Sequence, residues 1–468
     1  MNSRSPASAT QTVATFFTPL QFEDIPEAVR ESAKLRILDI FGICIAAGQK
    51  QEGAGLVETL AEWGNQGGTS SWIGTGEKVP PTVSALVDGT RAHGLDFDDT
   101  HHASRTHPSC VIIPAAWATA QAVHASGRDF LCGTVVGLEV LVRVGLVAPG
   151  RFHERGLHAT SLCGPIGAAA TASRLLGCDV GTTTQALGIA ASMGSGLREA
   201  YLGGDATDTK SLHAGLAAQG GVLAAGLARR GFTGPITALE GRFGFYNAYV
   251  SPDPWKIENL SASLGDKWHT PEIVFKLYPC GSLIHASIDA ALHLREITGL
   301  NPDEIATVSV VVPAGMVSTV CEPRDQKILP RSGYQAKFSA QYAVAAALLF
   351  GEVNAGTYED RMLSETRLRN LLRRTDYEVD HAMPFPDKYP GGVVVRMQDG
   401  AEYRESMVNS IGSPERPAGR EQLLKKFRSN VVPVLGSERA DHLADVILRI
   451  EHEANLEKIV DLCRAGAP

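Results

Sequence analysis

The sequence predicts a mainly helical protein in which a smaller α/β segment separates a helical N-terminal half from a helical C-terminal tail. Apolar and small residues recur at helical spacing through the first half. The composition changes over residues 251–271, where three prolines stand among mixed charges, and a β-branched, alternating run follows at 305–312. The 468 residues suffice for two domains with sizeable cores.

The first long helix is expected over 24–47, because Asp-Ile-Pro at its start supplies a cap and a first turn and Gly48 ends it. One face of this helix has an apolar residue at every fourth position: Val29, Ala33, Ile37, Phe41 and Ile45. Later helices are expected in segments rich in alanine and glycine, whose small side chains let helix axes approach closely. These segments are 114–125, 164–176, 182–195 and 214–229.

The second half of the sequence contains segments with the apolar spacing of helices and segments with the alternation of strands. We expect an amphipathic helix at 284–298, a strand at 305–312 and an apolar helix at 338–350. Residues 391–398 and 402–406 flank an Asp-Gly pair, which predicts a hairpin. The tail from 419 to 463 is expected to be helical again, with one long amphipathic stretch at 439–459.

Composition excludes several classes of function. A net charge of −8 argues against nucleic acid or an anionic membrane as partner. The eight cysteines form no CxxC pair, which argues against a zinc knuckle or a disulfide framework and fits a reducing cytoplasm. We find no signal peptide and no apolar run long enough to span a bilayer. Rossmann, P-loop, HExxH and GxSxG patterns are missing, so no nucleotide cofactor is expected, although pyridoxal phosphate has no spacing that would exclude it.

Residues 93–114 form the segment richest in chemistry. They contain Asp96, Asp98 and Asp99 together with His93, His101, His102 and His107, directly before an apolar helix. Titratable groups crowded at the mouth of a packed helix suit proton transfer at neutral pH. A solvated loop with capping residues is the alternative, and the carboxylates and histidines could also hold a metal ion. Asp-x-Asp-Asp followed by His is not a specific ligand pattern, so we expect no metal.

Three further clusters place basic side chains at expected helix ends. His158 and Thr160 stand before a Gly/Ala-rich helix, and Lys210 and His213 share one face of the next helix. Lys276 precedes the turn that contains Tyr278, and a weaker cluster lies at 333–342. A capping threonine, a surface histidine and lysines that extend to solvent are the alternatives. Together the clusters flank the expected domain boundary, and a cleft between domains is a common place for a site.

Read together, these segments resemble the MmgE/PrpD family, which includes 2-methylcitrate dehydratase, cis-aconitate decarboxylase and iminodisuccinate epimerase. The similar segments follow the family's order along the chain: 93–100 with 107–109, 156–158 with 164–170, 210–221 with 231–235, 276–279 with 285–291, and 336–347. The resemblance implies a homodimer. It also implies a large helical domain at 1–265, completed by 410–468, with a smaller α/β domain at 271–405 inserted.

The resemblance also implies site residues. In the decarboxylase branch, the LDFDDT motif falls on Asp96 and Thr100, and the HPS motif on His107. The spacing between Thr100 and His107 is one residue longer than in that branch. The remaining motif positions fall on His158, Lys210 and Lys276.

Chemistry assigns roles to these residues. Substrate carboxylates need positive partners, which suits Lys210, Lys276 and Arg105, and His107 and His158 suit proton transfer. Other expected substrate contacts are Thr100, Tyr278, His101 and His213. We therefore expect an enzyme without cofactor that acts next to a carboxylate of a small di- or tricarboxylate.

The outcome of the reaction depends on what leaves. In the dehydratase branch, Asp-Asn usually follows His-Pro-Ser. The run THPSCV lacks this pair, which argues against a dehydratase. Our preferred hypothesis is an epimerase of the iminodisuccinate type, with His107 and either Lys210 or His158 as opposed bases. A cis-aconitate decarboxylase-like lyase is the alternative, followed by a dehydratase-like lyase. A ligand-binding protein on the same fold is the alternative outside the enzymes.

Overall fold

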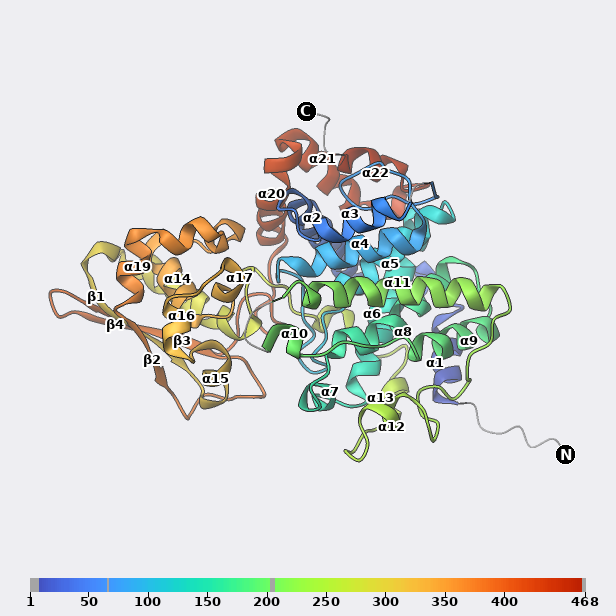
Figure 1. The fold of residues 1–468 in the computed structure, drawn as a ribbon, viewed down its shortest axis with the longest axis horizontal. Coiled ribbons are helices and arrows are strands. Elements are labelled where there is room, and N and C mark those ends of the chain that lie inside the picture. The colour runs from blue at the N-terminus through green and yellow to red at the C-terminus, as the bar shows by residue number, and fades with distance from the viewer. Residues whose placement is uncertain (1–7, 65–66, 203–206, 465–468) are drawn as a thin grey trace. The chain divides into compact units, whose positions relative to one another are not determined.

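The computed structural model describes residues 8–64, 67–202 and 207–464. The chain divides into two compact units (Figure 1). The first unit comprises described residues of the stretches 1–94, 98–274 and 420–468, and the second comprises 95–97 and 275–419. The boundaries expected from the sequence, 1–265 with 410–468 for the helical domain and 271–405 for the α/β domain, remain a prediction.

The first unit is helical. Its longer helices are α1 (Ala9–Phe17), α2 (Glu27–Gln49), α3 (Ala54–Glu62), α4 (Pro81–Gly94), α5 (Ser109–Ala122), α6 (Gly127–Leu146), α8 (Ala159–Leu175), α9 (Val180–Ala191), α11 (Thr209–Arg229), α20 (Arg420–Leu435) and α21 (Ser437–Leu448). Its shorter helices are α7 (Arg151–Glu154), α10 (Glu199–Leu202), α12 (Phe245–Tyr249), α13 (Glu258–Ser261) and α22 (Glu457–Cys463).

Small residues set the spacing of the central helices. Helix α11 packs against α4 and α8. A Cβ built on Gly215 of α11 would lie 2.3 Å from the carbonyl oxygen of Leu86 in α4, and one on Gly221 would lie 2.6 Å from the carbonyl carbon of Ala168 in α8. Backbone therefore meets backbone at these crossings, as the alanine- and glycine-rich composition predicts.

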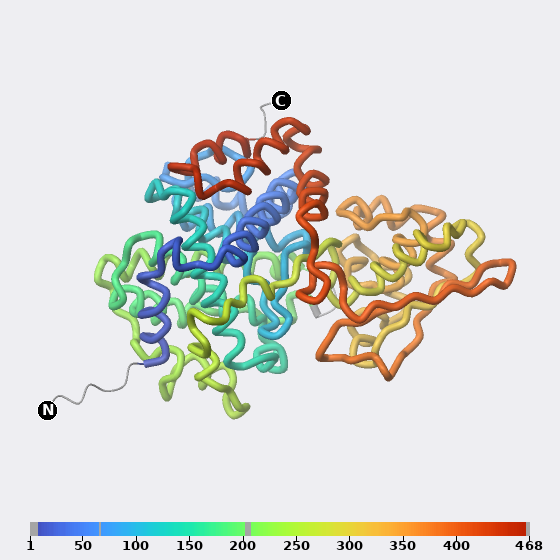
Figure 2. Tube along the Cα trace, turned by 180° about the vertical axis from the view of Figure 1, so that it is seen from behind, coloured from blue at the N-terminus to red at the C-terminus, as the bar shows by residue number. Residues whose placement is uncertain are grey.

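The C-terminal tail belongs to the same unit as the N-terminal helices. Figure 2 shows α20 and α21 beside α2, and both helices contact it. The Lys426 ammonium lies 2.6 Å from the Asp39 carboxylate, and both side chains are buried. A buried ion pair thus joins α20 to α2 across most of the sequence.

The second unit is built on a four-stranded mixed sheet. Its strands are β1 (Ile305–Val312), β2 (Thr375–Val379), β3 (Gly391–Met397) and β4 (Glu402–Met407), in the order β2-β1-β3-β4. β1 pairs parallel with β2 and antiparallel with β3, and β3 pairs antiparallel with β4. Helix α14 (His285–Thr298) packs on β3 and β4. The other helices of this unit are α15 (Val317–Val320), α16 (Arg324–Ile328), α17 (Gly333–Ala336), α18 (Ala340–Phe350) and α19 (Thr366–Leu372).

The predicted fold class, mainly helical with a smaller α/β part, is confirmed. Two details differ from the prediction. The amphipathic stretch at 439–459 is not one helix, because α21 ends at Leu448, a 3-10 turn follows at Ile450–His452, and α22 begins only at Glu457. Strand β2 was not predicted, since its sequence TDYEV is rich in charge and lies at the sheet edge. Within the described ranges, no helix combines the length and the apolar character needed to cross a bilayer.

Candidate active site

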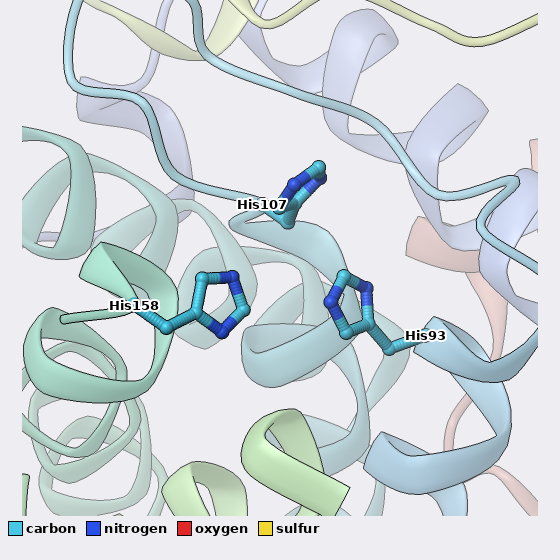
Figure 3. Close-up of side chains that lie close together, drawn as sticks. All are labelled: His93, His107 and His158. Atoms are coloured by element: carbon cyan, nitrogen blue, oxygen red, sulfur yellow. The ribbon is translucent and has the colours of Figure 1, made fainter. Parts of the chain in front are cut away.

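Three imidazole rings of the first unit converge on one point (Figure 3). His93 lies in the last turn of α4, His107 lies in the loop before α5, and His158 is the N-cap of α8. The ring centroid of His93 lies 4.9 Å from that of His107 and 5.7 Å from that of His158. Those of His107 and His158 are 6.2 Å apart. We call His93, His107 and His158 the histidine cluster.

A carboxylate orients two of these rings. Asp98 Oδ2 lies 2.8 Å from Nδ1 of His93 and 3.6 Å from Nδ1 of His107. The side chains of Asp98 and His93 are fully buried, whereas that of His107 is 17% exposed. Because an ionised carboxylate only accepts hydrogen bonds, Nδ1 of His93 donates to it. Asp98 thus stabilises positive charge on either ring.

The loop that contains His107 is held by buried polar contacts. The Asp99 carboxylate lies 2.7 Å from the Arg36 guanidinium and accepts from the hydroxyl and the backbone N–H of Ser109, at the start of α5. Nδ1 of His107 lies 2.9 Å from the carbonyl oxygen of Asp99 and 3.1 Å from the hydroxyl of Thr100. Since a carbonyl oxygen only accepts, Nδ1 of His107 bears the proton and Nε2 is the atom available for proton transfer.

His158 is paired with a fourth imidazole. Nδ1 of His158 lies 3.1 Å from Nδ1 of His213, which is on α11. Burial, followed by the neighbouring imidazoles and Lys210, holds the pKa of His158 well below its usual value. Burial, together with His93 and Lys210, lowers the pKa of His213 to about 4. Both rings are therefore neutral at pH 7.

Lys210 brings a buried positive charge to the same region. It lies in the first turn of the 21-residue helix α11 and is 5% exposed. Its ammonium lies 5.7 Å from the ring centroid of Tyr201, which lies 5.5 Å from that of His158. The positive end of the helix dipole adds to this charge, so an anion is favoured beside Lys210.

Two other predicted residues form a pair in the second unit. Asp96 Oδ1 lies 3.3 Å from the Lys276 ammonium, which also donates to the carbonyl oxygen of Asp96. Both side chains are 2% exposed. Asp96 has a φ of 52°, which is unfavourable for a residue other than glycine, so the surrounding structure holds it in a strained conformation. Lys337 donates to the carbonyl oxygen of the preceding residue, Leu95.

The remaining predicted residues lie elsewhere. Tyr278, in the second unit, donates to Asp289 at 2.6 Å. Arg105 is exposed and lies beside Gly150. Burial, followed by the charges of Arg198 and Arg105, lowers the pKa of His153 to about 3. His101 contacts Ser104 and Glu272. The structure thus gathers His107, His158, His213, Lys210 and Thr100, and it places Asp96 with Lys276. That both groups act on one substrate stays a prediction.

Sequence reasoning did not assign His93, Asp98 and Tyr201 to the site. The spacing of His93 and Asp98 was a usable signal, because a histidine in the last turn of a helix can meet an acidic residue in the loop that follows. Tyr201 lies in the short helix α10, before Lys210 in the sequence, and no local pattern marks it as part of the site.

The described residues offer two groups of metal-ligand type at the histidine cluster. One consists of His93, His107 and His158, and the other of His93, Asp98 and Cys110. Burial and the adjacent carboxylates raise the pKa of the Cys110 thiol well above its usual value, so it is a poor thiolate ligand. The aspartates predicted as alternative ligands do not share one point, since Asp96 pairs with Lys276 and Asp99 with Arg36.

Comparisons with known proteins find similarity to one family along nearly the whole chain. The MmgE/PrpD N-terminal domain matches residues 11–258, and the MmgE/PrpD C-terminal domain matches residues 278–452. Cis-aconitate decarboxylase of Homo sapiens is 29% identical, covering 98% of this chain and 95% of the human protein. Cis-aconitate decarboxylase of Aspergillus terreus is 25% identical over 100% of this chain and 98% of its own. 2-Methylcitrate dehydratase of Salmonella typhimurium is 24% identical over 80% of each. The chain belongs to the MmgE/PrpD family.

Proposed function

We propose that this protein is a lyase that removes carbon dioxide from a small tricarboxylate of the cis-aconitate type. The observation that supports this most is the convergence of three imidazoles beside a buried lysine in the first unit. The similarity to cis-aconitate decarboxylases over almost the whole chain adds to it.

The reaction requires one proton and no redox partner. The carbon–carbon bond to one carboxylate breaks, and its electron pair forms a new double bond. The electron pair of the old double bond moves to the carbon next to another carboxylate, where a proton adds. A trianion and one proton thus give a dianion and carbon dioxide. The enzyme must stabilise the charge that develops beside the remaining carboxylate and supply the proton at that carbon.

His107 is the proposed proton donor. It is the most exposed ring of the histidine cluster, and its Nδ1 is engaged by the carbonyl oxygen of Asp99, so that Nε2 delivers the proton. Asp98 stabilises the imidazolium form and keeps the ring oriented, while His93 shares that carboxylate. After each turnover, His107 is reprotonated from solvent.

Positive charge is proposed to come from two lysines. Lys210 at the start of α11 binds one substrate carboxylate in the first unit, with neutral His158 and His213 as hydrogen-bonding partners. Lys276 is the second predicted carboxylate partner, and its pairing with Asp96 keeps its buried charge compensated before substrate binds.

Decarboxylation is preferred over epimerisation of iminodisuccinate. The two kinds of relative reported above are named a decarboxylase and a dehydratase, which favours the lyase alternative. Epimerisation needs two opposed groups, one of which removes a proton while the other returns one. The homodimer implied by the family stays a prediction, which the mass of the protein in solution tests.

Side-by-side turnover of cis-aconitate, 2-methylcitrate and iminodisuccinate in deuterated water tests the proposal. We expect carbon dioxide from cis-aconitate in equal amount to product, with one solvent deuterium in each product molecule. Loss of water from 2-methylcitrate, or deuterium at the stereocentre of iminodisuccinate without carbon dioxide release, would replace decarboxylation by dehydration or epimerisation.

A further inference from the structure

A second group of ligand-type side chains lies outside the histidine cluster, also in the first unit. We call His101, His269 and Glu272 the His-Glu-His cluster. One donor atom from each of the three lies within 4.8 Å of the other two. Glu272 Oε2 is 2.8 Å from Nδ1 of His269 and 3.7 Å from Nε2 of His101.

The spacing suits one shared ion. Bonds of 2.0–2.1 Å to a tetrahedral cation separate neighbouring donors by about 3.3 Å, and the two distances at Glu272 lie on either side of that value. The longer distance exceeds a normal hydrogen bond. A clamp made only of hydrogen bonds therefore does not explain why His101 faces the same oxygen as His269.

Other contacts fix each ligand in place. Nδ1 of His101 lies 2.8 Å from the hydroxyl of Ser104, which leaves Nε2 toward Glu272. The backbone N–H of His269 donates to Glu139 at 2.8 Å. The second oxygen of Glu272 lies 3.2 Å from the Lys267 ammonium. Such surrounding contacts orient the ligands of metal sites in other proteins.

The cluster reaches the surface through one of its three side chains. The imidazoles are buried, whereas the Glu272 side chain is 38% exposed, which leaves a way in for an ion and a water ligand.

We propose that the His-Glu-His cluster binds one divalent cation of the zinc class through Nε2 of His101, Nδ1 of His269 and Oε2 of Glu272, with water completing the coordination. Two imidazoles and one carboxylate are a common ligand set for zinc and neighbouring metals. No step of the proposed reaction uses this ion.

The ion has a structural role. Thr100 and Val274 exchange two backbone hydrogen bonds, of 3.0 and 2.8 Å, beside the cluster. The cation links the same two segments through side chains. Because Thr100 also contacts His107, a bound ion holds the loop that orients His107. Metal is therefore expected to raise the thermal stability of the protein without supplying chemistry.

Metal titration of the full chain, first stripped with chelator, tests the proposal. We expect one equivalent of Zn²⁺ by calorimetry and one equivalent of Co²⁺ by visible absorption, with intensity typical of a four-coordinate site. Glu272→Gln and His269→Asn are expected to weaken binding at least ~100-fold, and to abolish the rise in melting temperature with Zn²⁺. Glu272→Gln keeps the size of a half-exposed side chain, so it tests binding without emptying the core.

Two control variants separate this site from other histidines. His293→Asn removes an exposed imidazole that lies 3.0 Å from Glu405. Within the described ranges this pair has no third residue of ligand type beside it, so the variant should bind Zn²⁺ like the unmodified protein. His158→Asn removes a member of the histidine cluster, and this variant should also still bind one equivalent of Zn²⁺. Absence of stoichiometric binding in the unmodified protein would overturn the proposal. The proposal would also be overturned if Glu272→Gln still bound one equivalent of Zn²⁺, or if His158→Asn bound none.

Discussion

Replacing Gly215 by alanine is expected to destabilise the first unit. The added Cβ would lie 2.3 Å from the carbonyl oxygen of Leu86 and 2.3 Å from the hydroxyl oxygen of Thr90, both on α4. One of these atoms is backbone, and the hydroxyl is already bonded to the same carbonyl, so neither can move aside alone. The axes of α11 and α4 must separate.

The magnitude follows from a matched substitution on the same helix. A Cβ on Gly226 of α11 would meet nothing within 4 Å. Both substitutions gain the same intrinsic helix propensity, about 1 kcal/mol, so the difference between them isolates the collision. Overpacking costs about 1–3 kcal/mol, and contact with backbone places Gly215→Ala at the upper end. Gly226→Ala is therefore expected to be about 3 kcal/mol more stable than Gly215→Ala.

Denaturant unfolding of the two variants, measured by circular dichroism beside the unmodified protein, checks this difference. We also expect Gly215→Ala to lower turnover, because α11 contains Lys210 and His213 while α4 contains His93. Equal stability of the two alanine variants would refute the argument that backbone contact sets the spacing of these helices.

Three other changes test buried charges. Asp98→Asn removes the carboxylate shared by two imidazoles and should lower kcat for carbon dioxide release by ~10²–10⁴-fold, with a folded protein by circular dichroism; a change under twofold would contradict its role. Lys426→Met leaves the buried Asp39 uncompensated and should cost about 3–5 kcal/mol in denaturant unfolding, which Asp39→Leu added to it should largely restore. The pKa of His213 is about 4 in the folded chain, so from about pH 6.5 down to pH 4 the unfolded chain binds a proton that the folded chain does not. The free energy of unfolding should therefore fall on acidification across this interval, and His213→Asn should flatten the fall; an unchanged slope would count against a neutral, buried ring.

The spacing and type of residues predicted the helices and strands that depend mainly on their own sequence. The strand Ile305–Val312 matches its prediction, because β-branched residues alternate over its length and suit a pleated, half-buried surface. The helix ending at Leu448 shows where pattern fails. Apolar residues continue at helical spacing beyond it, whereas the chain turns at Arg449, which has a φ of −120°. The apolar spacing of the local sequence therefore does not predict that turn.

In the candidate site, too, some features could be predicted from the sequence and others could not. His107 was singled out in a segment crowded with titratable groups, His158 and Lys210 were singled out at expected helix starts, and the family resemblance implied their place in the site. Their convergence could not be derived from spacing, since α4, α5, α8 and α11 meet only through tertiary packing. The separation of His101 from His107 was equally hidden, because a turn with a positive φ at Arg105 directs the two imidazoles to different clusters.

Release of carbon dioxide from cis-aconitate by His107→Asn, compared with His293→Asn as a folded control, is the measurement that bears most closely on the proposed chemistry. We expect kcat to fall at least ~100-fold in His107→Asn, with one solvent deuterium still present in each product molecule that forms, and to stay unchanged in His293→Asn. Full carbon dioxide release by a folded His107→Asn protein would contradict the assignment of the histidine cluster as the acid that completes the reaction.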